Sequence, residues 1–353
     1  MLKILTGQPS KTWISSGTIS ATHEEYRAPK TTDADEISNR INKEIQKYQA
    51  RTDKTKVATR LQKTKLDSIP FDVRHELSNE YTMISSVVVK YDGDRFYWEI
   101  NTNSRTDSVK PNPETPGEQF DAARNARRIF VWDGQEYTIY SRSGHRAIVD
   151  ATGSIPRGVT GPLTAGLIPW GYGAYTYENL SACEVSATEK HVDGQAQVHL
   201  TLTRSDGSQM VFVLDAERNF AVISHLEEGS DKTTFKHYGH YRVVSGRLVP
   251  TTIAIEQHDA LTNRLLASDF WDFKSISGSA PAVTDFSIAY DTDDIIEYKS
   301  PVTDKAVVYR YSPMIDVELL LAERVAFAAS EGSQEQNCRN WAETLRTASL
   351  LSS

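Results

Sequence analysis

The sequence predicts a mainly β (α+β) fold, in which a large antiparallel meander forms a half-barrel or open barrel with an N-terminal helical arm and C-terminal helices. Turn signals recur about every 10–16 residues between residues 184 and 277, which is typical of an up-and-down meander. Apolar residues alternate with polar ones on both sides of several Asp-Gly turns, as they do in half-buried strands. Apolar residues at helical spacing occur in two charged stretches, one near each end of the chain.

The first strand is predicted over Trp13–Tyr26, and a helical insertion follows it over residues 33–70. Asp33 with Glu36 three positions later is typical of a helix N-terminus. Between residues 40 and 65 the stretch holds nine basic residues against two acidic ones, so we expect a solvated, locally basic arm. The residues at helical spacing in this stretch are Ile37, Ile41, Ile45 and Tyr48.

Two Asp-Gly turns predict hairpins in the first half of the sheet. A two-residue turn at Asp92-Gly93 would place six apolar side chains on one face. Around Asp133-Gly134 apolar residues occupy both faces, so we expect this hairpin to be covered on both sides. The six side chains of the first hairpin are Val87, Val89, Tyr91, Phe96, Trp98 and Ile100.

The second half of the sheet follows a Gly-rich loop, which is expected over residues 143–182. A two-residue turn at Asp206-Gly207 would put Leu200, Leu202, Val211 and Val213 on one face. It would put Thr201, Thr203, Met210, Phe212 and Leu214 on the other face. Since neither face is cleanly polar, both should be partly covered, which implies a barrel, half-barrel or sandwich.

The last segment changes character again. Apolar residues between Val317 and Ala328 follow helical spacing, and a second helix is predicted from Gln334 to Leu351. The sequence therefore predicts one domain over residues 11–290 and a helical extension over residues 291–353.

Composition excludes several classes of partner. The net charge of −8 provides no positive field for nucleic acid. The apolar stretch Val317–Ala329 is interrupted by charges and too short to cross a bilayer. The N-terminus lacks the apolar run of a secretory signal, so the protein is expected either to stay inside the cell or to have lost its export signal.

The sequence holds no strong catalytic, phosphate-binding or zinc motif, so we expect no enzyme activity, metal or cofactor. His237 and His240 would point to opposite faces of a strand. Cys183 and Cys338 are expected to be unpaired thiols, and no histidine follows Cys338 to act as its base. A solvated loop is the expected setting of the acidic cluster Asp291, Asp293, Asp294 and Glu297.

Large apolar side chains beside the predicted turns have two interpretations. They fill the core, which we favour for each residue taken singly, or some of them line an apolar cavity under the sheet. The candidate cavity residues are Phe96, Trp98, Trp132, Tyr137, Trp170, Met210, Phe212 and Phe235.

The order of these elements resembles a known superfamily. Two hairpins of this chain carry the first part of the resemblance: Val87-Val-Val-Lys-Tyr-Asp-Gly-Asp-Arg-Phe-Tyr-Trp98 and Phe130-Val-Trp-Asp-Gly-Gln-Glu-Tyr137. The later segments that carry it are Val213-Leu-Asp-Ala-Glu-Arg218, Arg247-Leu-Val-Pro-Thr251, Thr252-Ile-Ala-Ile-Glu256, Phe270-Trp-Asp-Phe273 and a tail from Pro281 to Phe286. Over residues 11–290 this pattern is similar to the periplasmic lipoprotein-carrier and outer-membrane lipoprotein-sorting superfamily. The long basic arm, the Gly-rich segment and the C-terminal helices depart from the small carriers of that superfamily.

The resemblance implies a half-barrel closed by helices over an apolar cavity for lipid or lipoprotein acyl chains, in the periplasm or cell envelope. The leading hypothesis is therefore a non-enzymatic envelope protein that binds a lipid, a lipidated protein or a similar apolar ligand. The second hypothesis is a regulatory module that binds a protein partner through its arm or acidic tail. The third is a truncated enzyme, which rests only on Cys338 and the acidic cluster.

Overall fold

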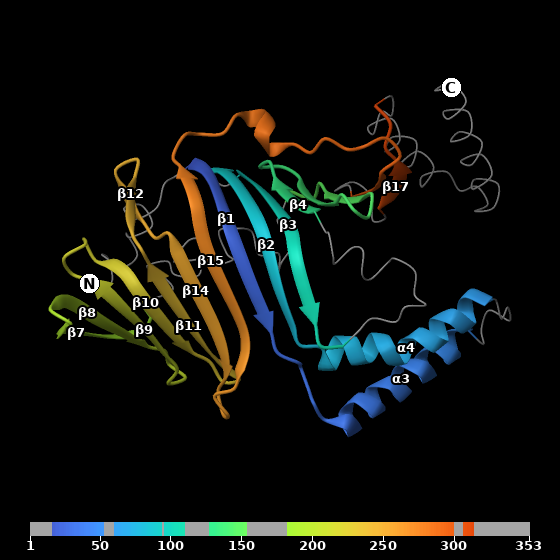
Figure 1. The fold of residues 1–353 in the computed structure, drawn as a ribbon, viewed down its shortest axis with the longest axis horizontal. Coiled ribbons are helices and arrows are strands. Elements are labelled where there is room, and N and C mark those ends of the chain that lie inside the picture. The colour runs from blue at the N-terminus through green and yellow to red at the C-terminus, as the bar shows by residue number, and fades with distance from the viewer. Residues whose placement is uncertain are drawn as a thin grey trace.

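The computed structural model describes residues 16–52, 60–93, 95–109, 127–153, 182–299 and 306–313. Its centre is a 15-stranded, mainly antiparallel sheet in the order β17-β16-β6-β5-β4-β3-β2-β1-β15-β14-β11-β10-β9-β8-β7. The sheet curves without closing into a barrel (Figure 1), so the predicted mainly β fold with an open half-barrel is confirmed.

Two meanders build this sheet and meet in its middle. The first runs through β1 (Ser16–Arg27), β2 (Tyr81–Asp92), β3 (Arg95–Asp107), β4 (Arg127–Trp132), β5 (Tyr137–Ser141) and β6 (Arg146–Asp150). The second runs back through β7 (Glu184–Val192), β8 (Gln195–Thr203), β9 (Gln209–Asp215), β10 (Ala221–Glu228), β11 (Lys232–Gly239), β14 (Thr252–Asp259) and β15 (Leu265–Ser277). β15 pairs with β1, and we call this junction of the two meanders the seam.

The remaining strands extend or flank the sheet. β12 (Arg242–Val244) and β13 (Arg247–Val249) form a separate hairpin between β11 and β14. β16 (Ile295–Lys299) pairs in parallel with β6, and β17 (Val307–Arg310) pairs with β16. β16 and β17 follow residue 290, where the sequence predicted helices, and β6 lies inside the predicted Gly-rich loop. The helices predicted after residue 316 lie outside the described residues.

The helical insertion forms a two-helix hairpin, α3 (Ala34–Thr52) and α4 (Arg60–Ser78), that projects from one end of β1 and β2 (Figure 1). Asp33 Oδ1 accepts hydrogen bonds from the backbone N–H groups of Asp35 (2.8 Å) and Glu36 (3.3 Å), which confirms the predicted helix start. The expected end at Pro70 is wrong, because α4 contains Pro70 and continues to Ser78. Neither described helix has an apolar stretch long enough to span a bilayer.

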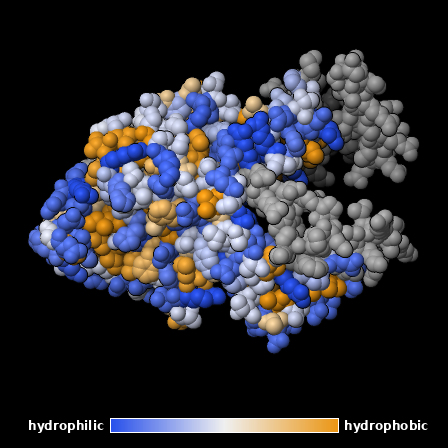
Figure 2. All heavy atoms as spheres, in the orientation of Figure 1, coloured by the Kyte–Doolittle hydropathy of each residue, from blue (hydrophilic) through white to orange (hydrophobic). Residues whose placement is uncertain are grey.

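Opposite faces of the sheet carry two hydrophobic clusters. The inner face, defined by Ile19, Val89, Trp98 and Trp271, holds the larger cluster, with members from both meanders. The outer face of β4–β6 holds the second cluster, which includes Phe286 from the 3-10 helix η2 (Val283–Phe286). β4 contributes to both clusters, so the Asp133-Gly134 hairpin is covered on both sides as predicted. Elsewhere, Figure 2 shows hydrophobic patches among hydrophilic residues on the face that it displays.

The pairing predicted around Asp206-Gly207 is wrong by one residue. Leu202 pairs with Met210 and Leu200 pairs with Phe212, so these four side chains share the inner face. The loop is longer than two residues: Gly207 N–H donates to the Arg204 carbonyl (3.0 Å), and Gly207 has a φ of +85°. This three-residue turn with a left-handed glycine shifts the register by an odd number, which reverses the faces on one strand. In contrast, Tyr91 pairs with Phe96 and Val89 with Trp98, which confirms the shared face predicted there.

Candidate functional site

A cavity of about 580 Å³ opens on the inner face beside the seam. Its apolar wall comprises Met83, Trp98, Ile100, Ile255 and Trp271. Its charged lining comprises His23, Glu25, Arg27, Glu227, Asp231, Lys232, Lys236 and Asp269. The cavity therefore joins a hydrophobic surface to a dense set of charges.

The strand sequences explain why both kinds of side chain meet here. Along β1 the inner face carries Ile19 and Ala21 first and then His23, Glu25 and Arg27. Side chains on one face of a strand occur at every second residue, so the inner face of β1 changes from apolar to charged along its length. β15 runs antiparallel to β1 and makes the same change from Phe273 and Trp271 to Asp269.

A network of ion pairs crosses the seam in the cavity wall. Asp269 Oδ1 lies 2.9 Å from His23 Nε2 and accepts a hydrogen bond from Arg27 Nη2 at 3.0 Å. Burial alone would raise the pKa of Asp269, but the hydrogen bonds and positive charges of His23 and Arg27 lower it. Asp269 is therefore held as a carboxylate in a largely buried position.

Arg27 also links this pair to Glu25. Arg27 Nε lies 3.3 Å from Glu25 Oε1, and the Tyr81 hydroxyl donates a 2.6 Å hydrogen bond to the same oxygen. Burial, followed by the negative charge and hydrogen bonding of Glu25, raises the pKa of Tyr81, which therefore stays a neutral donor. Both carboxylates of the seam are thus already bound to donors of the protein.

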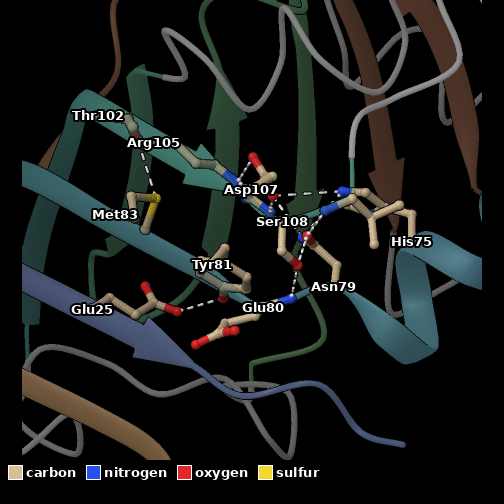
Figure 3. Close-up of polar contacts among 11 residues, drawn as sticks. Glu25, His75, Asn79, Glu80, Tyr81, Met83, Thr102, Arg105, Asp107 and Ser108 are labelled. Atoms are coloured by element: carbon tan, nitrogen blue, oxygen red, sulfur yellow. Dashed lines mark hydrogen bonds and ion pairs between the residues drawn. The ribbon is translucent and has the colours of Figure 1, made fainter. Parts of the chain in front are cut away.

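Next to Tyr81, a second polar group fixes the helical arm to the sheet (Figure 3). The Arg105 guanidinium lies 4.2 Å from the centre of the Tyr81 ring and donates to Asp107 at 2.8 and 3.0 Å. Asn79, directly after α4, donates to Asp107 at 2.6 Å, and Figure 3 shows these side chains converging where α4 meets β2 and β3. These contacts tie the residue that follows α4 to the end of β3.

Two indole groups form the largest part of the apolar wall. Trp271 is 1% exposed and Trp98 is 7% exposed. Neither Nε1–H has a hydrogen-bond partner in the described part of the chain. Buried donors without partners are uncommon in folded proteins, so these two N–H groups are exceptions within the described residues.

The acids and histidines could suggest metal binding or catalysis. Within the described ranges, His23, Glu25 and Asp269 place potential ligand atoms within 4.8 Å of one another, as do His145, Asp291 and Asp294. In the first group the Arg27 guanidinium already pairs with both carboxylates. Ser85 lies opposite His23 on β2, but its hydroxyl makes no hydrogen bond to the described residues, so it does not form a nucleophile and base pair with His23.

The second of these groups corrects an expectation. A solvated acidic loop was predicted for residues 291–297, but Asp294 is fully buried. It accepts hydrogen bonds from the Tyr140 hydroxyl (2.7 Å) and the Asp291 backbone (2.8 Å), and His145 Nδ1 lies 3.0 Å away. These contacts lower the pKa of Asp294 against the opposing effect of burial, so this carboxylate is a structural group that joins the β16 segment to β5.

Of the eight candidate cavity residues, Trp98 lines the cavity. Phe235 is 40% exposed and does not line this cavity, whereas its neighbour Lys236 does, since alternate strand residues face opposite sides. Trp170 and the thiol of Cys338 lie outside the described residues, and Cys183 is a half-buried free thiol. The five that belong to the same buried inner cluster as Trp98 are Phe96, Trp132, Tyr137, Met210 and Phe212.

The charged half of the site was missed by sequence reasoning. Its residues come from β1, β10, β11 and β15, and His23 and Asp269 are 246 positions apart. The local signal was present in β1, where the alternating positions of one face change from Ile19 and Ala21 to His23, Glu25 and Arg27. A buried face that turns charged within one strand indicates a polar site.

Comparison with solved structures finds a number of similar chains, among them the following three. A LolA superfamily protein from Nitrosomonas europaea is 13% identical, with 81% of this chain and 96% of that chain covered and a TM-score of 0.37. A DUF1329 family protein from Desulfovibrio piger is 10% identical, with coverages of 81% and 95% and a TM-score of 0.38. An uncharacterized conserved protein from Thermus thermophilus is 7% identical, with coverages of 84% and 98% and a TM-score of 0.30.

No protein-family model matches the sequence, and no curated protein is detectably similar to it.

Proposed function

We propose that this protein is a non-enzymatic carrier of the cell envelope that binds a lipid, a lipidated protein or a similar apolar ligand in the seam cavity. One observation carries the proposal: a cavity of about 580 Å³ lies in an open sheet and is walled by two nearly buried indoles with unpartnered N–H groups. Cavities of roughly 300–1,000 Å³ are typical of small-molecule sites. The sequence resemblance to the lipoprotein-carrier superfamily supports the envelope as its location.

The apolar wall suits an acyl chain. Met83, Ile100 and Ile255 line the cavity beside the two indoles, and burying a chain against such a surface stabilises the complex by about 0.8 kcal/mol for each CH₂ group. Binding of this kind needs no reacting group.

The residues behind this wall give it a fixed shape. We propose that Trp98 contacts the ligand directly, since it lines the cavity. Five buried side chains of the same cluster would hold the wall in place: Phe96, Trp132, Tyr137, Met210 and Phe212. A preformed wall lowers the entropy cost of binding.

Native mass spectrometry of the purified protein after exposure to a bacterial lipid extract tests this function. The proposal predicts a stoichiometric mass increase, and extraction should return a molecule with at least one acyl chain. A protein that keeps its apo mass under conditions in which a known lipid carrier is loaded would contradict the proposal.

A second candidate function is favoured by the arm of α3 and α4. This hairpin projects from the end of the sheet (Figure 1), and its exposed residues include several Lys and Arg side chains, such as Arg40 and Lys47. A regulatory module that binds an acidic protein partner would use this surface and would leave the cavity empty. A protein that keeps its apo mass in the lipid experiment would favour this second function. Loss of partner binding when Arg40 and Lys47 are replaced with Gln would support it.

A further inference from the structure

Among the charged residues of the cavity lining that are not exposed, Lys236 is the one whose charge no described hydrogen bond or ion pair matches, whereas Asp231 and Lys232 are exposed. It lies on β11, where its backbone pairs with His225 on one side and Ile255 on the other. Its side chain is half-buried and lines the cavity. The described residues supply no hydrogen bond or ion pair to its ammonium group.

Three of the four carboxylates that line the cavity already pair with other donors of the protein. Asp269 is bound by His23 and Arg27, and Glu25 is bound by Arg27 and Tyr81. The nearest acidic influence on Lys236 is Glu227, which accepts a 2.6 Å hydrogen bond from Arg204. The remaining acid of the lining, Asp231, is exposed at the rim.

The immediate surroundings of Lys236 disfavour a charged ammonium group that has no negative charge beside it. Burial of His225 lowers its pKa to about 3, with a further lowering by Lys236, so the imidazole is neutral at physiological pH and supplies no negative charge. Burial also lowers the pKa of Lys236, while Glu227 raises it. Removing an ammonium group from water is costly unless an opposite charge lies beside it.

We propose that the ligand is an amphiphile with an anionic head, a carboxylate or a phosphate, and that this head pairs with Lys236 while its acyl chain lies against Trp98 and Trp271. This inference rests on the proposed function and names the chemical class of the ligand. A free fatty acid and an anionic phospholipid share this chemistry. Lys236 and the apolar residues line the same cavity, so a ligand that contacts both would bind in one orientation.

The test uses three probes with the same acyl chain: oleate, 1-oleoyl-lysophosphatidylglycerol and uncharged monooleoylglycerol, each below its critical micelle concentration. Titration calorimetry measures their affinities for the wild-type protein, Lys236→Met and Lys236→Arg. Lys236→Met keeps the apolar stem and removes the charge. Lys190→Met is the matched control, because Lys190 is exposed on the edge strand β7 outside the cavity.

We expect at least one of the two anions to bind the wild-type protein roughly tenfold or more tightly than monooleoylglycerol, since a hydrogen bond to a charged partner is worth about 1.5–3 kcal/mol. Lys236→Met should lose this preference while binding monooleoylglycerol as before. Lys236→Arg should keep most of the preference, and Lys190→Met should match the wild type. A preference for oleate alone would identify a carboxylate head, and a preference for the lysophospholipid alone would identify a phosphate head.

Two results would overturn the inference. Equal affinity of all three probes, or an anion preference that survives in Lys236→Met, would exclude Lys236 as the headgroup site and leave the proposed lipid-binding function standing. Failure of every probe to bind any variant would remove the proposed function along with the inference.

Discussion

The imidazole of His23 stacks on the indole of Trp271 across the seam, with ring centroids 3.8 Å apart and planes 12° from parallel. His23 belongs to the first meander and Trp271 to the second, so this pair joins the two halves of the sheet. The same imidazole is bonded to Asp269, and the same indole walls the cavity. The stability of the seam and the shape of the binding site therefore depend on the same side chains.

Replacing Asp269 with Asn should destabilise the protein. The substitution leaves the positive charge of Arg27 with Glu25 as its remaining partner, and the expected loss is about 2–3 kcal/mol in the free energy of unfolding. Denaturant unfolding measures it. Glu256→Gln is the matched control, because Glu256 is exposed and its pair with His258 should contribute less than about 0.5 kcal/mol. Equal losses in the two variants would contradict the assigned role of Asp269.

Stability should fall in acid because of His225. Its pKa is about 3 in the folded protein and about 6.5 in the unfolded chain, so only the unfolded state gains the proton between these values. The free energy of unfolding should therefore decrease as the pH falls from about 6.5 towards 3, by up to about 1.4 kcal/mol per pH unit from this residue. His225→Phe should flatten this dependence, whereas His237→Gln, at an exposed position, should not. Identical pH slopes for both variants would exclude His225 as the cause.

Filling the cavity should weaken binding without affecting the fold. Ile100→Trp introduces bulk into the cavity lining, and we expect the affinity for monooleoylglycerol to fall roughly tenfold or more. Ile84→Trp places the same side chain on the other face of β2, where Ile84 pairs with Glu24, and should bind like the wild type. Calorimetry gives the affinities, and circular dichroism checks that both variants fold. Full binding by Ile100→Trp would show that the ligand lies elsewhere.

The stability cost of a substitution at Gly207 should depend only on how well the new residue adopts the left-handed backbone conformation. An added Cβ would meet no atom within 4 Å, and the φ of +85° is unfavourable for a β-branched side chain. Gly207→Val should cost about 1–2 kcal/mol of unfolding free energy, and Gly207→Asn clearly less. Thermal and denaturant unfolding compare the two. Equal costs would contradict the left-handed turn that sets the register of β8 and β9.

Much of the fold could be predicted from the sequence because strand alternation survives small errors in the turn. At Asp92-Gly93 the observed pairing of Tyr91 with Phe96 differs from the expected one by an even number of positions, so the predicted face was retained. At Asp206-Gly207 the difference is odd, and the faces were exchanged. Strand alternation and turn residues did not reveal β16, because this strand forms by parallel pairing with β6, about 150 residues earlier in the chain.

The site could be predicted only in part. Trp98 was named because aromatic residues beside turns are common in cavities, and the structure places it in the lining. The polar half depends on long-range pairing: only the register of β1 with β15 brings His23 and Arg27 to Asp269. A single sequence also does not say which face of a strand points to the cavity. For this reason it could not show that Lys236 lines the cavity while its neighbour Phe235 faces the other side.

Whether an acyl chain lies in the seam cavity can be measured by quenching of tryptophan fluorescence with a glycerol monoester of 9,10-dibromostearate, because bromine quenches the indoles that the acyl chain contacts. We expect saturable quenching of the wild-type protein that is clearly reduced in Trp98→Phe and in Trp271→Phe. Saturable quenching that both variants retain in full would place the acyl chain outside the seam cavity.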